Sequence, residues 1–285
     1  MFDFALKAKE IDKGVYRISG MAVYRYLFVG EKAALLMDTG YGIANLKKLV
    51  ESITDKPLYV VNSHYHPDHS NGNQQFDKIY INENDLPFAG KGLGIEYLVE
   101  TISTALVENH KWVKAIKKPL CNAMLCARAQ KTEYVPVKND HVFDLGGKTI
   151  IMHHVPGHTE GSCVLVDVEA KTIYTGDSCN TGCWLWTNPE CTATQFADSL
   201  DDFADYVKNN KIKTLRCSHN PMADKPGFAK FYANQMRKLG SGEKHPLISI
   251  HLPGLDTPLC ITPCMGFHKG SFYGGMCFHL GGQMK

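Results

Sequence analysis

Ser63-His64-Tyr65-His66-Pro67-Asp68-His69 is the stretch of this chain that says most about its fold and its chemistry. It places three imidazoles and one carboxylate within seven residues. The apolar run Leu58–Val61 precedes it and is typical of a buried strand, so these polar groups are expected on a loop at the carboxyl end of that strand. Imidazole nitrogens and carboxylate oxygens suit zinc or a similar ion, and burying them without one would be costly. The stretch therefore predicts a metal site; the alternative is a solvated polar loop.

Three more residues with metal-ligand side chains occur later in the chain. Each comes after a short apolar run that is typical of a strand, and one lies in a turn marked by glycine and proline. These residues are His158, Asp177 and His219. Every candidate ligand thus lies at or after the carboxyl end of a predicted strand.

The order of these residues resembles the pattern of the metallo-β-lactamase-fold hydrolases: H-x-H-x-D-H, a distant His, an Asp after Gly, and a last His. All seven positions match, and the resemblance covers the chain from about Val15 to Asn220. The resemblance implies one ion held by His64, His66 and His158, a second held by Asp68, His69 and His219, and Asp177 as a bridge between them. Two Zn²⁺ ions are the expected cofactors, although sites made of His and Asp also bind iron or manganese.

The implied metal pair would supply the nucleophile. Two divalent ions about 3.5–4 Å apart share a water, lower its pKa and present hydroxide to a carbonyl or phosphoryl centre. Asp68 is the candidate catalytic residue, because it could orient that hydroxide and carry a proton to the leaving group. Asp38 ends another apolar strand, and the resembled family implies that it orients the metal ligands without binding the metal. The alternative for Asp38 is an ordinary strand-end turn.

The periodicity of the chain predicts two sheets, each backed by helices, and the α+β, four-layer αββα sandwich of the resembled family satisfies that prediction. The expected strands are 14–18, 22–29, 33–37, 58–61, segments near Val135, Ile150, Val164 and Ile173, and a strand in the stretch 214–221 that ends with His219; the expected helices are 43–53, 194–208 and 228–239. One catalytic domain is expected over residues 1–245, with a helical insertion at about 86–128 and a short β extension over 246–285. The insertion could be a lid over the metals or a structural appendage.

The segment that follows Asp177 offers candidates for a substrate pocket. Aromatic side chains beside a metal ligand can line a pocket for an apolar or aromatic substrate group, although they can equally pack in the core. The candidate pocket residues are Cys179, Trp184, Trp186 and Asn220. Cys179 is not expected to be a nucleophile, because the metal ions supply one.

Charge and composition restrict the partners. The formal net charge is +2, from 31 basic and 29 acidic residues, and argues against nucleic acid as a partner. No stretch has the length of a transmembrane helix and the start lacks the features of a secretory signal, so a cytoplasmic location without a membrane partner is expected. The ten cysteines are expected to be reduced thiols. A small-molecule substrate is the expected partner, and a homodimer is left open.

The leading functional interpretation is a dinuclear metal-dependent hydrolase in which a hydroxide that bridges the metals attacks a carbonyl substrate, such as a thioester, ester, lactone or lactam. One alternative is a di-iron redox enzyme that reduces oxygen or nitric oxide, although the resembled proteins usually have Glu where this chain has His66. A second alternative is a phosphodiesterase or nuclease, against which the charge argues. A catalytically inactive binding module is disfavoured, because no metal position is lost.

Overall fold

The computed structural model describes most of the chain. The described residues are 6–20, 23–42, 44–90, 132–180, 182–185, 188–220, 224–251, 257–268, 271–273 and 276–283. The predicted helical insertion lies outside the described residues from position 91 onward. The chain divides into two compact units: Met1–Ile81 with Leu86–Pro136, and Asn82–Asp85 with Val137–Lys285. The proposed division into a catalytic domain and a C-terminal extension stays a prediction.

The first unit is built on a seven-stranded sheet whose strands follow one another in chain order. They are β1 (Lys7–Asp12), β2 (Val15–Gly20), β3 (Val23–Val29), β4 (Ala34–Met37), β5 (Leu58–Val61), β6 (Lys78–Asn82) and β7 (Glu133–Val137). Strands β1 to β4 are antiparallel neighbours, whereas β4, β5 and β6 run parallel. The carboxyl ends of β4 and β5 therefore lie at the same edge, and this places Asp38 beside the histidine-rich loop.

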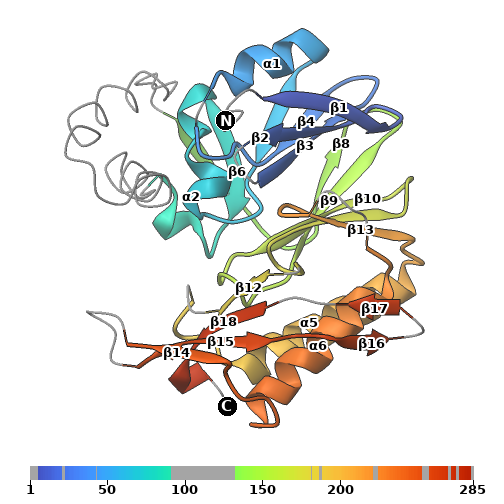
Figure 1. The fold of residues 1–285 in the computed structure, drawn as a ribbon. Helices are drawn as coiled ribbons and strands as arrows, with labels where there is room; N and C mark the ends of the chain where they lie inside the picture. Colours follow the sequence, from blue (N-terminus) through green and yellow to red (C-terminus); the bar gives the residue numbers. More distant parts are fainter. Residues whose placement is uncertain are drawn as a thin grey trace, which may run out of the picture. The chain divides into compact units, whose positions relative to one another are not determined.

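One face of this sheet is covered by helix α1 (Leu46–Ile53), which lies beside the strands in Figure 1. The helix begins after Asn45, whose side chain accepts a hydrogen bond from the Lys48 amide at 2.9 Å and so caps the first turn. Its buried residues Leu46 and Val50 join an apolar cluster with strand residues such as Leu36. The same unit contains the short helix α2 (Pro67–Ser70) and 3-10 turns at Asn73–Gln75 and Leu86–Phe88.

The Leu36→Ala substitution is expected to lower the free energy of unfolding by about 2–5 kcal/mol, because it removes a fully buried side chain and leaves a cavity in this cluster. Urea denaturation of the variant and the parent protein measures the change. Leu247→Ala is the matched control, since Leu247 is 69% exposed and its loss should change stability by less than about 0.5 kcal/mol. Equal losses in the two variants would contradict the prediction.

The second unit contains a five-stranded sheet in the order β13-β11-β10-β9-β8. The strands are β8 (His141–Asp144), β9 (Thr149–His154), β10 (Cys163–Asp167), β11 (Thr172–Gly176) and β13 (Thr214–Cys217). Strand β10 is antiparallel to both β9 and β11, and β11 is parallel to β13. Strands β9, β11 and β13 thus end at one edge of the sheet, and each is followed by a candidate metal ligand.

Two helices complete the core of this unit, α5 (Ala193–Asn209) and α6 (Gly227–Gly240), which lie side by side (Figure 1). Helix α5 begins with a reciprocal capping box: Thr192 accepts from the Gln195 amide, and the Gln195 side chain accepts from the Thr192 amide. Their buried faces share one apolar cluster with strand residues of the sheet. Each unit is therefore a sheet backed by helices, as the periodicity predicted.

The C-terminal part of the chain is a small β structure within the second unit. A four-stranded sheet has the order β12-β18-β15-β14, and β16 pairs with β17. The bounds are β12 (Gly182–Trp184), β14 (Ile248–Ile250), β15 (Leu259–Pro263), β16 (Gly266–His268), β17 (Ser271–Tyr273), β18 (Met276–Leu280) and a final 3-10 turn, Gly281–Gln283. The cysteines that the structure describes are all free thiols.

Several strands have no clear signal in the sequence. Strand β1 is an exposed edge strand with four charged residues in six, so it shows no apolar alternation. Strands β6 and β8 are short and are flanked by polar turns, which weakens the periodic signal. Among the described residues, no helix is long and apolar enough to cross a membrane.

Candidate metal centre

The first unit gathers four candidate ligands on the loop and turn that follow β5. Pro67 occupies the first position of α2 and is preset for a helical turn. The Ser70 hydroxyl lies 2.7 Å from the Tyr65 carbonyl oxygen and 3.0 Å from that of His66, which ties the loop to the helix. These contacts fold back the segment that carries the ligands. The four residues are His64, His66, Asp68 and His69.

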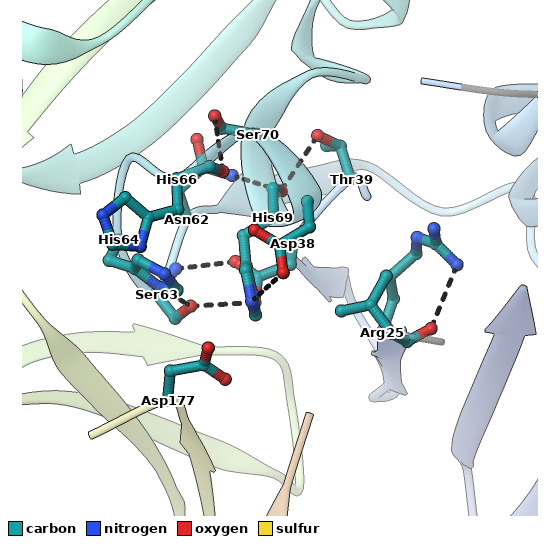
Figure 2. Close-up of polar contacts among 12 residues, drawn as sticks. Arg25, Asp38, Thr39, Asn62, Ser63, His64, His66, His69, Ser70 and Asp177 are labelled. Carbon is teal, nitrogen blue, oxygen red and sulfur yellow. Dashed lines mark hydrogen bonds and ion pairs between the residues drawn. The ribbon is translucent and has the colours of Figure 1, made fainter. Parts of the chain in front are cut away.

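Asp38 connects the histidine loop to β4 and fixes the orientation of two imidazoles (Figure 2). Its Oδ1 accepts from the Ser63 amide at 2.8 Å, and its Oδ2 accepts from the Ser63 hydroxyl and from His69 Nδ1, both at 2.8 Å. Because the Ser63 proton points to Asp38, His64 Nδ1, 3.0 Å from Ser63 Oγ, must be the donor in that contact. Both rings then carry their proton on Nδ1, which leaves Nε2 as the electron-pair donor that a metal requires.

A buried network of hydroxyl and amide groups supports the same loop and was not identified from the sequence. Thr39 Oγ1 donates to Asn73 Oδ1 at 2.8 Å, and Asn73 Nδ2 donates to Asn62 Oδ1 at 2.7 Å. The main-chain oxygen of His69 accepts from the Thr39 amide at 2.7 Å and from Asn62 Nδ2 at 3.3 Å. The backbone on both sides of the ligand loop is thus held by satisfied hydrogen bonds.

Arg25 also lies near the candidate ligands and was not identified from the sequence. It is only 2% exposed, and burial lowers the pKa of its guanidinium to about 10, while Asp38, Asp68 and Tyr41 act in the opposite direction. The guanidinium stays protonated at neutral pH. Its hydrogen bonds to the Gly20 carbonyl are long, at 3.4 and 3.5 Å, and Nε has no hydrogen-bond partner among the described residues. Arg25 therefore acts mainly through its charge on the nearby acidic side chains.

The second unit gathers three candidate ligands at the shared edge of β9, β11 and β13. Asp177 Oδ2 lies 3.6 Å from His158 Nε2 and 3.2 Å from His219 Nε2. The other oxygen, Oδ1, accepts from Asn180 Nδ2 at 3.2 Å, so Asn180 helps to orient the carboxylate. One oxygen of Asp177 is therefore close to two imidazoles, which come from the segments that follow β9 and β13.

The distances within each unit fit a metal ion. Ligand atoms about 2.1 Å from a tetrahedral ion are about 3.4 Å from one another. The His158–Asp177 and His219–Asp177 pairs lie close to this value, as does the pair His69 Nε2–Asp68 Oδ2 at 3.4 Å. The nitrogen and oxygen donors suit zinc, iron or manganese. The residues present in both units thus fit the metal ligation that the sequence predicted, and which ligands share an ion stays a prediction.

The candidate pocket residues are in different environments. Cys179 is 1% exposed and belongs to the apolar core of the second unit; burial raises the pKa of its thiol well above the usual value. Trp184 is 41% exposed and stacks on Phe278, with ring centroids 4.4 Å apart. Asn220 follows the candidate ligand His219 after the end of β13 and is partly buried, whereas Trp186 lies outside the described residues. A pocket formed by these residues stays a prediction.

This chain is similar to a known protein family in sequence and to solved structures in fold. The model of the metallo-beta-lactamase superfamily matches residues 20–87 and 92–219. The chain belongs to the metallo-beta-lactamase superfamily, and the predicted fold is confirmed.

Relatives of known name are distant in sequence. The chain is 22% identical to acyl-coenzyme A thioesterase MBLAC2 of Homo sapiens over 252 residues, which is 82% of this chain and 85% of the relative. A metallo-beta-lactamase from Pontibacter korlensis has a TM-score of 0.56 at 15% identity, over 82% of this chain and 99% of its own. The sec-alkylsulfatase Pisa1 from Pseudomonas sp. has a TM-score of 0.61 at 13% identity, over 83% of this chain and 42% of its own.

Proposed function

We propose that this protein is a metal-dependent hydrolase of acyl thioesters, with acyl-coenzyme A thioesters as the first candidate substrates. Membership of the superfamily and the thioesterase name of the relative support the bond class. The observation that carries the metal-dependent part is the single oxygen of Asp177 near the Nε2 atoms of His158 and His219. A carboxylate oxygen in this position can join two metal ions, because each imidazole can bind its own ion beside the shared carboxylate.

The ligand assignment follows the family pattern. His64, His66 and His158 would hold one ion, and Asp68, His69 and His219 the other, with Asp177 between them. Two zinc ions are proposed, with iron or manganese as alternatives. The cytoplasmic location and the absence of membrane and nucleic-acid partners remain predictions from the sequence, and a homodimer remains open.

A metal pair bound there would lower the pKa of water and polarise the thioester carbonyl. Asp68 is proposed to orient the attacking water, take its proton and pass that proton to the leaving sulfur, so that the products are a carboxylic acid and a thiol. Its carboxylate suits this task because its side chain is 21% exposed, and because its Oδ2 lies next to the His69 Nε2 atom. Asp38 and Ser63 would keep His64 and His69 in the metal-binding tautomer during turnover.

The test is elemental analysis of the purified protein together with a substrate screen. The screen contains an acyl-coenzyme A thioester, an aryl ester, a lactone, a lactam, an alkyl sulfate and a phosphodiester. Two zinc ions per chain and selective thioester turnover would support the proposal. Two iron ions, no hydrolysis, and consumption of oxygen or nitric oxide would contradict it in favour of the redox alternative.

The Asp68→Asn substitution is expected to lower kcat by about 10²- to 10⁴-fold, because the amide cannot accept the proton. The metal content should stay close to that of the parent, which separates proton transfer from metal loss. Asp55→Asn, at an exposed position, serves as the control and should retain parental activity. Full activity of Asp68→Asn with both metals bound would remove Asp68 from the catalytic step.

A further inference from the structure

The loop that carries His158 joins β9 to β10 in a conformation that depends on glycine. The Val155 amide donates to the Ser162 carbonyl at 2.9 Å, which closes the base of the loop. Gly157 has φ of 143°, in a region that residues with a side chain rarely adopt, and a Cβ there would lie 1.9 Å from the Phe196 ring. The backbone beside His158 is therefore tightly packed at Gly157.

One side of the loop is held by Asp85, from a segment of the first half of the chain that belongs to the second unit. Asp85 is fully buried; its Oδ2 accepts from the Thr159 hydroxyl and its Oδ1 from the Gly161 amide, both at 2.8 Å. The Ser162 hydroxyl accepts from the Thr159 amide at 2.9 Å. A Cβ on Gly161 would lie 2.5 Å from the Asp85 carboxyl carbon, so the carboxylate is in close contact with the loop backbone.

The other side of the loop is held by Asn188. Its Nδ2 donates to the Gly157 carbonyl and to Glu160 Oε1, both at 3.1 Å. The segment around Asn188 is in turn fixed by Gln283, near the end of the chain. Gln283 Nε2 lies 2.9, 2.8 and 2.9 Å from the carbonyl oxygens of Leu185, Asn188 and Cys191.

We propose that Asp85 and Asn188 are positioning residues for His158, and that Gln283 keeps Asn188 in place. The proposal rests on the proposed function, because it takes His158 to be a metal ligand. The contacts meet the loop at residues 157, 159, 160 and 161, on both sides of the histidine in the sequence. Burying the Asp85 carboxylate costs free energy of desolvation. Its two hydrogen-bond donors, Thr159 and Gly161, follow His158 closely in the sequence. These bonds offset that cost and hold the backbone of the His158 loop in one conformation.

The direct test is the metal affinity of the Asp85→Ala and Asn188→Ala variants, measured by competition with a chromophoric chelator for Zn²⁺. We expect one of the two ions to bind about 10- to 100-fold more weakly in each variant. The absorption bands of the Co²⁺-substituted variants should shift, because they report the geometry of the ligands. Asp85→Asn should bind within about threefold of the parent, since an amide can accept from Gly161 and donate to the Thr159 hydroxyl.

Asp198→Ala is the matched control, because Asp198 is 63% exposed and lies on α5. Parental Zn²⁺ affinity and an unchanged Co²⁺ spectrum in both Asp85→Ala and Asn188→Ala would overturn the inference while leaving the proposed function intact. A parent protein that binds no divalent metal would instead contradict the proposed function. If Asp85→Ala does not fold, Gln283→Ala replaces it, and weaker binding of one ion is again the expected result.

Discussion

The Asp38→Asn substitution is expected to weaken zinc binding by about 10- to 100-fold, although the side chain keeps its shape. The Asp38 carboxylate accepts protons from the Ser63 hydroxyl and from His69 Nδ1. An amide nitrogen in the same place would donate, so His69 would have to accept on Nδ1 and carry its proton on Nε2. The Ser63 hydroxyl would turn toward His64 Nδ1, with the same consequence for that ring. Both histidines would then present N–H groups to the metal instead of electron pairs.

Chelator competition with Zn²⁺ and the stoichiometry of bound metal measure this effect. Asp38→Ala should lose metal affinity as well, and its free energy of unfolding should fall by about 3–5 kcal/mol, because the buried Arg25 loses a compensating charge and the Ser63 amide loses its acceptor. Asp198→Asn, on an exposed carboxylate, is the control for Asp38→Asn. Parental zinc affinity in Asp38→Asn would show that Asp38 does not set the tautomers.

The Gly40→Ala substitution is expected to lower the free energy of unfolding by about 2–4 kcal/mol, more than left-handed backbone strain explains alone. Gly40 has φ of 71°, and a Cβ there would lie 1.8 Å from Arg25 Nη2. The buried guanidinium would have to move away from Asp38 and Asp68. The Gly40 amide also donates to the His69 carbonyl at 3.2 Å, so a shift of this turn should weaken metal binding as well.

Gly242→Ala is the matched control for this prediction. Gly242 has φ of 76°, and a Cβ there would meet nothing within 4 Å. The control variant should therefore lose only the strain contribution, about 1 kcal/mol. Urea denaturation and zinc titration of the two variants separate strain from the displacement of Arg25. Equal losses of stability in Gly40→Ala and Gly242→Ala would contradict the prediction.

The secondary structure around the candidate metal ligands was largely predictable because the signals are local. Strand β5 is a short apolar run next to the polar loop, and its observed bounds agree with the expectation. Helix α5 was expected at 194–208 and runs from Ala193 to Asn209; the capping box of Thr192 and Gln195 sets its observed start. Helix α1 starts later than expected because the Asn45 side chain caps it.

The residues that support the candidate ligands were not predictable, because they are distant in sequence from the residues they contact and are of common types. Asp85 is 76 residues from Gly161, and Gln283 is 95 residues from Asn188. A single Asp, Asn or Gln carries no periodic or motif signal, and such residues are usually found on the surface. Arg25 lies in a strand that is otherwise largely apolar. Its position beside Gly40 and near Asp38 and Asp68 is set only by tertiary packing.

The sequence by itself determined the superfamily, the residue types of the candidate ligands and the position of each candidate after a strand. It could do so because metal ligands need particular donor atoms, and because strands and helices have local periodicities. Only the tertiary structure decided which imidazole nitrogens are oriented for a metal, through Asp38 and Ser63, and which side chains clamp the His158 loop. Those features depend on hydrogen bonds between segments that meet only when the sheets have formed. The geometry of hydrogen bonds between residues far apart in the sequence has no sequence signature.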